Sequence, residues 1–398
     1  MSQQLPIRRV LQVHTRYRQP GGEDLVVEAE KELLESAGIS VDQVMFDNAE
    51  LQEGSSLAGD VRLAASAIWS RRAQRRVADA IGAQNPDVVH VHNTFAAASP
   101  SVFAAARGVP IVHTLHNYRM VCPVAITFRD GHACTDCVGR AIPWPGVLHA
   151  CVRGSRAQSA VAAVTVAVHR GVGTYRRIGV YVALTAFQRA LMIEGGLAAA
   201  RIKVIPNFLE PDPGTGTGPR SGVVYVGRLA VEKGVEVLLG AARIRPGNVS
   251  IIGDGPLAPA VKQAAAEHYL EFLGPVDRSS AVHRLRAAVA LVVPSLWFEG
   301  FPLTVVEAYA TGTPVIASRI GSLAEVVEDG ATGLLVDTHD ADALAERIQW
   351  AITHPNEMRE MGSNARRLYE ARLRGATHLA DLLDAYQAAG AMRSFAGA

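Results

Sequence analysis

Short apolar runs alternate with helical stretches along most of this chain, and this alternation limits the possible folds more than any other feature. In the first half, a helix is predicted over residues 23–38, because its apolar residues recur at helical spacing and Gly38 can end it. The runs that we interpret as buried strands cover residues 8–15, 40–47, 87–93, 110–117 and 180–187. Strands separated by helices form a parallel sheet that is covered on both faces. The first half is therefore predicted to be a doubly wound α/β domain.

One segment, residues 203–222, interrupts the alternation with a composition rich in proline, glycine and threonine. Such a composition is typical of a linker or hinge. The alternation then begins again, with apolar runs at residues 222–229, 249–257, 269–276, 289–295, 313–318 and 333–337. Since 398 residues are too many for one ordinary core, the sequence predicts two domains.

The predicted fold class is α/β, with two Rossmann-like doubly wound parallel-sheet domains that face each other across a cleft. We expect the first domain over residues 1–205, the second over residues 206–376, and a C-terminal helix over 377–398 that crosses back to the first. Folds of this kind hold their ligands at the carboxyl ends of the strands. Candidate site residues are therefore expected at strand ends.

Composition and charge exclude several classes of protein. The net charge of +1 gives no electrostatic basis for a nucleic-acid partner. The first residues lack the apolar segment of a signal peptide, and the longest run rich in alanine and valine, 157–168, is shorter than the ~20 residues of a membrane helix. A cytoplasmic location is therefore predicted. The arginines around that run favour either a solvated basic face or peripheral contact with the inner face of a membrane; they are Arg153, Arg156, Arg170, Arg176 and Arg177.

The glycine patterns do not match the common nucleotide cofactor motifs. A nicotinamide site needs G-x-G-x-x-G between a strand and a helix. Gly253 and Gly255 follow an apolar run, but Pro256 and Ala258 occupy the positions after them, and the chain has no Walker P-loop. No cofactor is predicted to take part in catalysis.

The turn after the apolar run 222–229 carries two cations. Arg228 lies at the end of the run and Lys233 follows five residues later, at an expected helix start, with Gly227 and Gly234 on either side. An arginine fork and a lysine point charge on one turn suit a diphosphate. The chain has only four lysines, at positions 31, 203, 233 and 262, so a lysine in this position is less easily explained as a solvated surface residue.

The stretch "EGFPLTVVEAYATG", residues 299–312, supplies a second polar group. Pro302 is predicted to begin the first turn of a helix. The free amides around Leu303 and Thr304 would then lie at the positive end of this helix, where they can bind an anion or a hydroxyl. Glu307 falls about one turn into the helix, where it can accept both hydroxyls of a ribose, and Glu299 precedes the turn.

These residues carry a family resemblance. "GRLAVEKG" and "EGFPLTVVEAYATGTPVIAS" resemble the signature of the retaining glycosyltransferases of family 4, which have the GT-B fold. The second half is similar nearly throughout, including "VIPNF", "IIGDGPL", "FLGPV" and "GLLVD", and the first half is similar at "PGGED" and "HTLHN". The resemblance implies an enzyme that moves a hexose-type sugar from a UDP- or GDP-sugar to a hydroxyl acceptor, with retention and without a catalytic metal.

The resemblance also implies roles for single residues. Arg228 and Lys233 would bind the diphosphate and Glu307 the ribose, while the base would be held by backbone groups around Gly274 to Val276. Glu299 and the amides after it would surround the donor sugar, and these are the amides of Gly300, Phe301, Leu303 and Thr304. The leaving phosphate would itself help to deprotonate the acceptor. The predicted catalytic set is Glu299, His116, Arg228 and Lys233.

The first half is expected to complete the site. Gly21 and Gly22, in "PGGED", follow the first strand and open a helix, where they would let the backbone approach a phosphate or sugar closely, although Gly-Gly before a helix is also ordinary loop chemistry. His116 lies at a strand end, and the resemblance gives it a hydrogen bond to the donor sugar. Asn117 and Arg119 are candidates for contact with the acceptor. The remaining histidines of these strands are interpreted as core residues, and they are His90, His92 and His113.

All four cysteines fall within 30 residues, inside a segment at 119–155 that is predicted to be an insert in the first domain. They are Cys122, Cys134, Cys137 and Cys151. A C-x-x-C pair with two outlying cysteines has the count and clustering of a structural tetrahedral zinc site. Free or partly paired thiols are the alternative, and disulfides are disfavoured in the cytoplasm.

Other functions remain open at this point. A GT-B sugar-nucleotide epimerase would share the nucleotide site, and an inactive nucleotide-sugar-binding protein would keep the fold without the reaction. A glycan phosphorylase would need a pyridoxal lysine late in the chain, and no lysine follows Lys262. The donor base, the sugar and the acceptor are not identified by the sequence; a lipid-linked glycan, a polysaccharide and a small metabolite are all compatible as acceptors.

Overall fold

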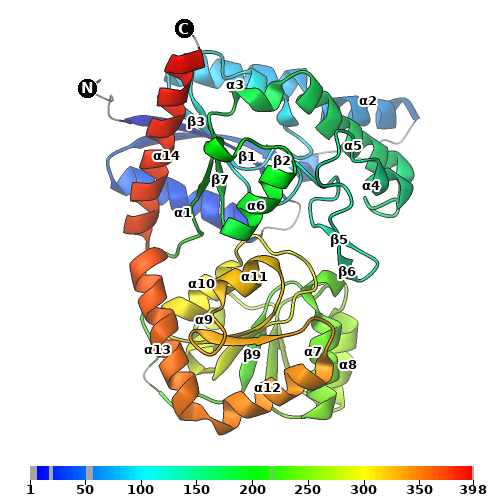
Figure 1. Cartoon of the computed structure of the whole chain (residues 1–398), viewed down its shortest axis with the longest axis vertical. Helices are drawn as coiled ribbons and strands as arrows, with labels where there is room; N and C mark the ends of the chain where they lie inside the picture. Colours follow the sequence, from blue (N-terminus) through cyan, green and yellow to red (C-terminus); the bar gives the residue numbers. More distant parts are fainter. Residues whose placement is uncertain (1–6, 18–20, 51–56, 217, 397–398) are drawn as a thin grey trace. The chain divides into compact units, whose positions relative to one another are not determined.

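The computed structural model describes residues 7–17, 21–50, 57–216 and 218–396, and the chain divides into two compact units (Figure 1). Unit 1 contains residues 1–126, 135–205 and 379–398, and unit 2 contains residues 127–134 and 206–378. Each unit is built on a six-stranded parallel sheet. The predicted α/β class with two doubly wound parallel sheets is therefore confirmed.

The sheet of unit 1 has the strand order β2-β1-β3-β4-β7-β8. The strands are β1 (Arg9–Arg16), β2 (Ser40–Asp47), β3 (Val88–Val91), β4 (Ile111–Thr114), β7 (Val180–Ala183) and β8 (Ile202–Val204). The helices are α1 (Gly22–Ser36), α2 (Leu57–Ile68), α3 (Arg71–Gln84), α4 (Trp144–Leu148), α5 (Arg156–Gly171) and α6 (Ala186–Glu194). Because helices connect parallel strands, the strands are buried on both faces, and this accounts for their nearly continuous apolar runs.

The last helix, α14 (Gly375–Ala396), belongs to unit 1 from Leu379 onward. Leu382, Ala385, Tyr386 and Ala389 pack against strand residues such as Val10, Val88 and Val112 in one buried cluster. Figure 1 shows this helix, in red, running along the sheet. The C-terminal segment thus completes the core of a sheet whose strands lie far earlier in the sequence.

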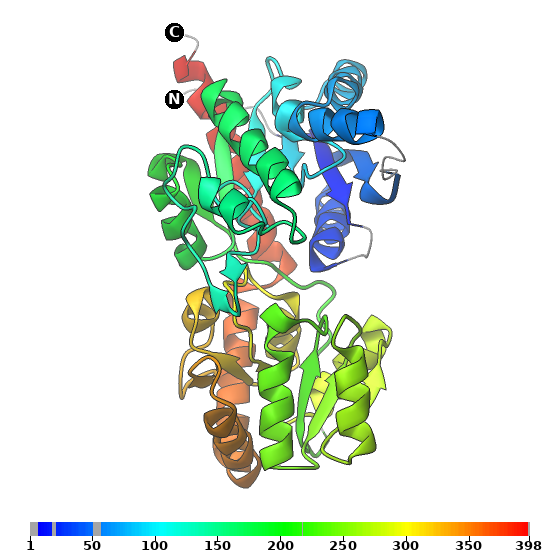
Figure 2. The same cartoon turned by 90° about the vertical axis from the view of Figure 1, so that its right-hand side faces the viewer.

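The sheet of unit 2 has the strand order β11-β10-β9-β12-β13-β14. The strands are β9 (Val223–Val226), β10 (Val249–Ile252), β11 (Glu271–Gly274), β12 (Ala290–Val293), β13 (Val315–Ser318) and β14 (Gly333–Val336). The helices are α7 (Val235–Ile244), α8 (Ala258–Ala266), α9 (Arg278–Ala287), α10 (Leu303–Ala310), α11 (Gly321–Val326), α12 (Ala341–Thr353) and α13 (Pro355–Arg372). Helices α7 and α8 pack side by side on this sheet (Figure 2).

A short hairpin completes unit 2. It consists of β5 (Phe128–Arg129) and β6 (His132–Ala133), which pair antiparallel. Its chain segment, 127–134, comes from within the predicted insert but is counted with unit 2. The ring of His132 lies 4.8 Å from that of His339, measured between centroids.

The strand orders define where ligands are expected. In each sheet the direction of winding reverses at one point, between β1 and β3 in unit 1 and between β9 and β12 in unit 2. Doubly wound folds bind ligands outside the carboxyl ends of the strands at such a reversal. Within the described part of the chain, no helix combines the length and apolar character that crossing a membrane requires.

Candidate functional site

In unit 2, Lys233 and Glu299 meet at the point where the winding reverses. Lys233 follows β9, Glu299 follows β12, and these two strands are neighbours in the sheet. The Lys233 ammonium donates to both carboxylate oxygens of Glu299, at 2.8 and 3.0 Å. Ser295 donates a further hydrogen bond to Oε1 of Glu299 at 2.7 Å. The Lys233 ammonium also lies 5.0 Å from the centre of the Trp297 ring, so both partners of the ion pair are held in position.

The backbones of the two turns touch, and Gly234 makes this contact possible. Its φ is +69°, and a Cβ atom at this position would lie 1.8 Å from the carbonyl oxygen of Pro294. The amide of Leu296 donates to the carbonyl of Glu232 at 2.9 Å across the same contact. The lysine was predicted at a helix start; it lies in a short 3-10 turn that ends just before Gly234.

Arg228 has a carboxylate partner of its own. Its guanidinium donates to Glu232, four residues later, and the Arg228 side chain is about half exposed while Glu232 is largely buried. Sequence reasoning did not identify Glu232, although an Arg and a Glu four residues apart are a common ion-pair spacing. The two predicted cations of this turn are thus each oriented by a carboxylate.

Glu307, which was predicted to hold a ribose, lies in α10 and is 6% exposed. Arg278, at the start of α9, donates from its Nε to Oε1 of Glu307 at 2.8 Å. Burial raises the pKa of Glu307, and the nearby Arg278 opposes that shift. Val276, two residues before Arg278, is 38% exposed. Sequence reasoning missed Arg278; its position just after β11 is the signal that could have identified it.

The amino end of α10 carries no side-chain cap. Pro302 was predicted to begin the first turn, but it precedes the helix as its N-cap with extended backbone (φ −63°, ψ 126°), and Leu303 is the first helical residue. The amides of Leu303 and Thr304 therefore belong to the first turn, whose N–H groups have no partner within a helix. Phe301 is buried, and its carbonyl accepts a hydrogen bond from Asn207 at 2.7 Å.

The glycines of "IIGDGPL" pack against the turn that carries Arg228. A Cβ at Gly253 would lie 1.9 Å from the carbonyl oxygen of Gly227, and one at Gly255 would lie 2.5 Å from that of Leu229. The amide of Leu229 donates to the carbonyl of Asp254 at 2.8 Å. These glycines therefore allow two loops to approach closely, a role that does not require a dinucleotide.

In unit 1, His116 follows β4 and bonds to His92, which follows β3. The two rings stack with centroids 5.3 Å apart, and Nδ1 of His92 lies 3.0 Å from Nε2 of His116. The other ring nitrogen of His92 lies 3.5 Å from a carboxylate oxygen of Glu30, a buried residue of α1. Burial lowers the pKa of His92 well below its usual value, so its imidazole is neutral.

The three histidines interpreted as core residues are buried: His90, His92 and His113 are 0, 2 and 8% exposed. His90 bonds to Tyr386 at 2.9 Å and to Thr114 at 2.8 Å. His113 bonds to the carbonyl of Val91 at 2.9 Å, and burial lowers its pKa to about 4.

Gly21 and Gly22 stand at the amino end of α1, and Pro20 of the same motif lies outside the described residues. The amide of Gly21 donates to Asp24 at 2.8 Å, and the other carboxylate oxygen of Asp24 lies 2.8 Å from Nε2 of His14. A Cβ at Gly21 would have no atom of the described residues within 4 Å.

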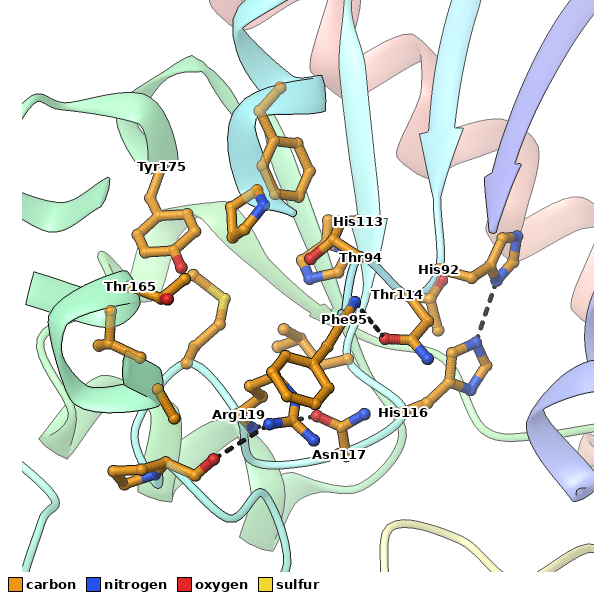
Figure 3. A pocket seen from close by; sticks show the side chains of 18 residues that line it. His92, Thr94, Phe95, His113, Thr114, His116, Asn117, Arg119, Thr165 and Tyr175 are labelled. Atoms are coloured by element: carbon orange, nitrogen blue, oxygen red, sulfur yellow. Dashed lines mark hydrogen bonds between the residues drawn. The ribbon is translucent and has the colours of Figure 1, made fainter. Parts of the chain in front are cut away.

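A pocket in unit 1 lies beside His116 (Figure 3). Its lining comes from the strand ends of β3 and β4, from α5 and from the turn after His116, and it is partly open to solvent. Arg119 and Asn117 contribute polar groups, while Phe95, Phe103 and Tyr175 contribute aromatic ones. The candidates for contact with the acceptor thus share one pocket with the histidine of the predicted catalytic set.

Glu23 lies next to this region, and burial raises the pKa of its carboxyl group from 4.5 to about 8. Between these two values the folded state keeps a proton that the unfolded state has lost. The Glu23 contribution to the free energy of unfolding is therefore expected to fall as the pH rises from about 4.5 to about 8.

Urea unfolding of the wild type and of Glu23→Gln at pH 5, 6, 7 and 8 tests this expectation. The stability of the wild type relative to the variant should decrease steadily over this range. The buried histidines have the opposite effect below pH 6.5, where their contribution to stability rises with pH. Both proteins contain these histidines, so the difference between their unfolding free energies reports on Glu23 alone. A difference that does not change with pH would contradict the assignment.

The four cysteines are thiols in the structure, with Cys122 and Cys137 buried and Cys134 and Cys151 half-buried. Cys134 belongs to unit 2 and the other three to unit 1. In the described residues, the side chains that bring three possible metal-ligand atoms within 4.8 Å of one another are those of Glu30, His90 and His92. The four-cysteine zinc site therefore stays a prediction.

Comparisons with known proteins follow the division into two halves. The family described as glycosyl transferase 4-like domain matches residues 12–207, and the family described as glycosyl transferases group 1 matches residues 218–368. Together the two matches span most of both units.

Among curated proteins, the chain is 33% identical over 146 residues to the glycosyltransferase MJ1178 of Methanocaldococcus jannaschii. The aligned residues cover 36% of this chain and 41% of that protein. It is 38% identical over 144 residues to a D-inositol 3-phosphate glycosyltransferase of Mycobacterium sp., and the aligned residues cover 33% of this chain and 33% of that protein. The chain thus matches well under half of the length of these relatives.

Among solved structures, the chain resembles Anabaena Alr3699/HepE in complex with UDP, with a TM-score of 0.64 and 19% identity, over 94% of this chain and 98% of that one. At this level of identity the similarity concerns the fold.

Proposed function

Because this chain belongs to the glycosyltransferases of the GT-B fold, with a 4-like half followed by a group 1 half, we propose that it moves a hexose-type sugar from a UDP- or GDP-sugar to a hydroxyl acceptor, with retention of the anomeric configuration. The observation that carries the proposal is the Lys233–Glu299 pair. It lies where the winding of the unit 2 sheet reverses, and Glu299 is on the turn just before the uncapped amino end of α10.

Arg228 and Lys233 are assigned to the diphosphate. Negative charge grows on the diphosphate as the bond to the sugar breaks, and two cations that are already oriented lower the energy of that state. Glu232 and Glu299 supply this orientation, because each bonds to one of the cations. The bond from the acceptor oxygen to the anomeric carbon forms on the face that the diphosphate leaves, and the acceptor proton passes to a diphosphate oxygen.

The remaining residues of unit 2 are assigned to the sugar and the nucleoside. Oε1 of Glu307 accepts from Arg278, so Oε2 is assigned to the ribose hydroxyls. The backbone around Val276 is assigned to the base. Glu299 and the amino end of α10 are assigned to the donor sugar through Gly300, Phe301, Leu303 and Thr304.

In unit 1, His116 is assigned to a hydroxyl of the donor sugar, and Gly21 and Gly22, at the amino end of α1, to the phosphate or the sugar. Nδ1 of His92 lies 3.0 Å from Nε2 of His116, and this contact orients the His116 ring. His92 is a positioning residue in this scheme.

The location proposed is the cytoplasm, with peripheral contact at the inner face of a membrane. Residues 137–193 contain seven arginines and no aspartate or glutamate. Exposed apolar side chains lie in the same segment, and they are Ile142, Trp144 and Leu148. Basic residues next to exposed apolar ones favour binding to an anionic lipid surface.

We also propose that Cys122, Cys134, Cys137 and Cys151 bind a structural zinc ion. Protein purified without added zinc is expected to contain about one equivalent, because structural zinc is bound tightly and contributes to folding. Elemental analysis measures the content, and Cys134→Ser is expected to lower it. Less than about 0.2 equivalents in the wild type would rule out the zinc site.

The proposed activity is tested with a panel of UDP- and GDP-linked hexoses. The best donor should raise the unfolding midpoint, since a ligand at 100 times its Kd stabilises a protein by about 2.7 kcal/mol. The anomeric configuration of the transferred or hydrolysed sugar, read by NMR, should match that of the donor. Inversion would overturn the assignment of retention, and a panel in which nothing binds or reacts would overturn the proposed function.

A further inference from the structure

The pocket beside His116 contains a cation, Arg119, that forms no ion pair with a carboxylate of the described residues. Arg119 donates from Nη1 to the carbonyl of Pro123 at 3.0 Å, and its guanidinium lies 3.7 Å from the centre of the Phe95 ring. In Figure 3 the guanidinium lies against this ring, with Asn117 beside it. No carboxylate of the described residues forms an ion pair with it, and its Nε is buried without a hydrogen-bond acceptor.

The acids that face Arg119 are held in their neutral forms. Burial raises the pKa of Glu23 to about 8 and raises the pKa values of Tyr17 and Tyr175 far above neutrality. Burial also lowers the pKa of Arg119 itself, which shows that its charge is poorly solvated. Arg119 is partly buried, and a charge withdrawn from water without an opposite charge is costly, so such a group is more readily explained by a ligand than by a contribution to folding.

The shape and chemistry of the pocket narrow down the ligand. The neighbouring histidines do not compete for an anion, because burial keeps His92 and His113 neutral. Phe95 and Pro123 fix the plane of the guanidinium, and a fixed guanidinium binds phosphate or carboxylate through two parallel hydrogen bonds. Phe103 and Tyr175 place apolar surface in the same pocket.

We propose that this pocket binds an anionic group, phosphate or carboxylate, carried by the acceptor, and that Arg119 is the residue that binds it. This inference rests on the proposed transferase function, since it assigns the substrate class of the acceptor side of that site. The proposal predicts that acidic acceptors bind in preference to neutral ones, because a neutral acceptor would bring no negative charge to the guanidinium.

The test uses three small probes of similar size: phenyl phosphate, phenylacetate and the neutral benzyl alcohol. Their dissociation constants are measured by calorimetry on the whole chain in its wild-type form, in Arg119→Met and in Arg76→Met. Arg76 is the matched control, because it lies over the Phe46 ring at 5.0 Å in the same unit and outside the pocket. At least one anionic probe should bind the wild type and Arg76→Met at least tenfold more tightly than benzyl alcohol does, and Arg119→Met should lose that preference.

The comparison of phenyl phosphate with phenylacetate identifies which anion the pocket prefers. The unfolding midpoint of Arg119→Met should stay within about 3 °C of the wild type, since methionine keeps apolar contact with Phe95 and removes a charge that has no carboxylate partner. A larger decrease would assign Arg119 to the fold and overturn the proposal. Equal binding of anionic and neutral probes by the wild type, or an equal loss in both variants, would overturn it too. Donor binding, measured on the same samples, reports separately on the proposed transferase function and should be unchanged in Arg119→Met.

Discussion

Replacing Lys233 by alanine is expected to lower sugar transfer by about 10²–10³-fold or more, the usual loss when one oriented group that stabilises transition-state charge is removed. The ammonium lies 2.8 and 3.0 Å from the two oxygens of Glu299 at the carboxyl end of the unit 2 sheet. The fold should persist, but the variant should lose up to about 3 kcal/mol of stability, because Glu299 is only 5% exposed and its buried charge would lose its cation. Steady-state kinetics and urea unfolding measure the two effects.

The two effects can be separated with further variants. Lys262→Ala removes an exposed lysine of α8 in the same unit and should leave both activity and stability unchanged. Glu299→Ala should also abolish transfer. The double variant Lys233→Ala/Glu299→Ala should recover stability relative to Lys233→Ala, since no buried carboxylate is left without its cation, but it should stay inactive. Near-normal turnover in either single variant would show that the pair is not part of the catalytic site.

Replacing Gly234 by alanine is expected to cost about 3 kcal/mol or more and to lower activity with it. About 1–2 kcal/mol comes from placing a Cβ in left-handed backbone, and the remainder comes from moving the Pro294 carbonyl, whose oxygen would lie 1.8 Å from the added Cβ. That movement separates the turn after β9 from the turn after β12. The distance between Lys233 and Glu299 would change, so the loss of activity should exceed what partial unfolding explains.

Gly247→Ala is the matched control. Gly247 also has a positive φ, +89°, but among the described residues no atom lies within 4 Å of a Cβ placed there. It should therefore lose only the backbone contribution and keep full activity. Thermal unfolding should place Gly234→Ala well below Gly247→Ala, by several degrees. Similar midpoints for the two variants would mean that the close contact with Pro294 does not constrain the turn.

The fold was largely predictable because both sheets are parallel and buried. Strands covered on two faces produce short continuous apolar runs, and helices between them produce a 3.6-residue period, so both signals are strong. The positions of Lys233 and Glu299 follow from the same logic, since each comes shortly after an apolar run. Pro302 was predicted inside the first turn but lies just before it, because proline is accepted at both positions.

The partners of the site residues were not predictable from local pattern. Arg278 and Glu307 are 29 positions apart and meet because α9 and α10 follow different strands and pack together. The contact between Glu30 and His92 depends in the same way on α1 covering β3. Glu232 could have been identified by its spacing from Arg228. The lack of a charged partner for Arg119 depends on the burial of Glu23 near it, which a sequence does not reveal.

Titration of UDP and of GDP into the wild type and Lys233→Ala, followed by calorimetry, tests the central claim most directly: that the carboxyl ends of β9 and β12 form a nucleotide-diphosphate site. One of the two nucleotides should bind the wild type and Lys262→Ala with the same affinity. Lys233→Ala should bind that nucleotide at least tenfold more weakly, which corresponds to a loss of about 1.4 kcal/mol. Absence of binding by both nucleotides, or equal affinity in the wild type and Lys233→Ala, would contradict the account.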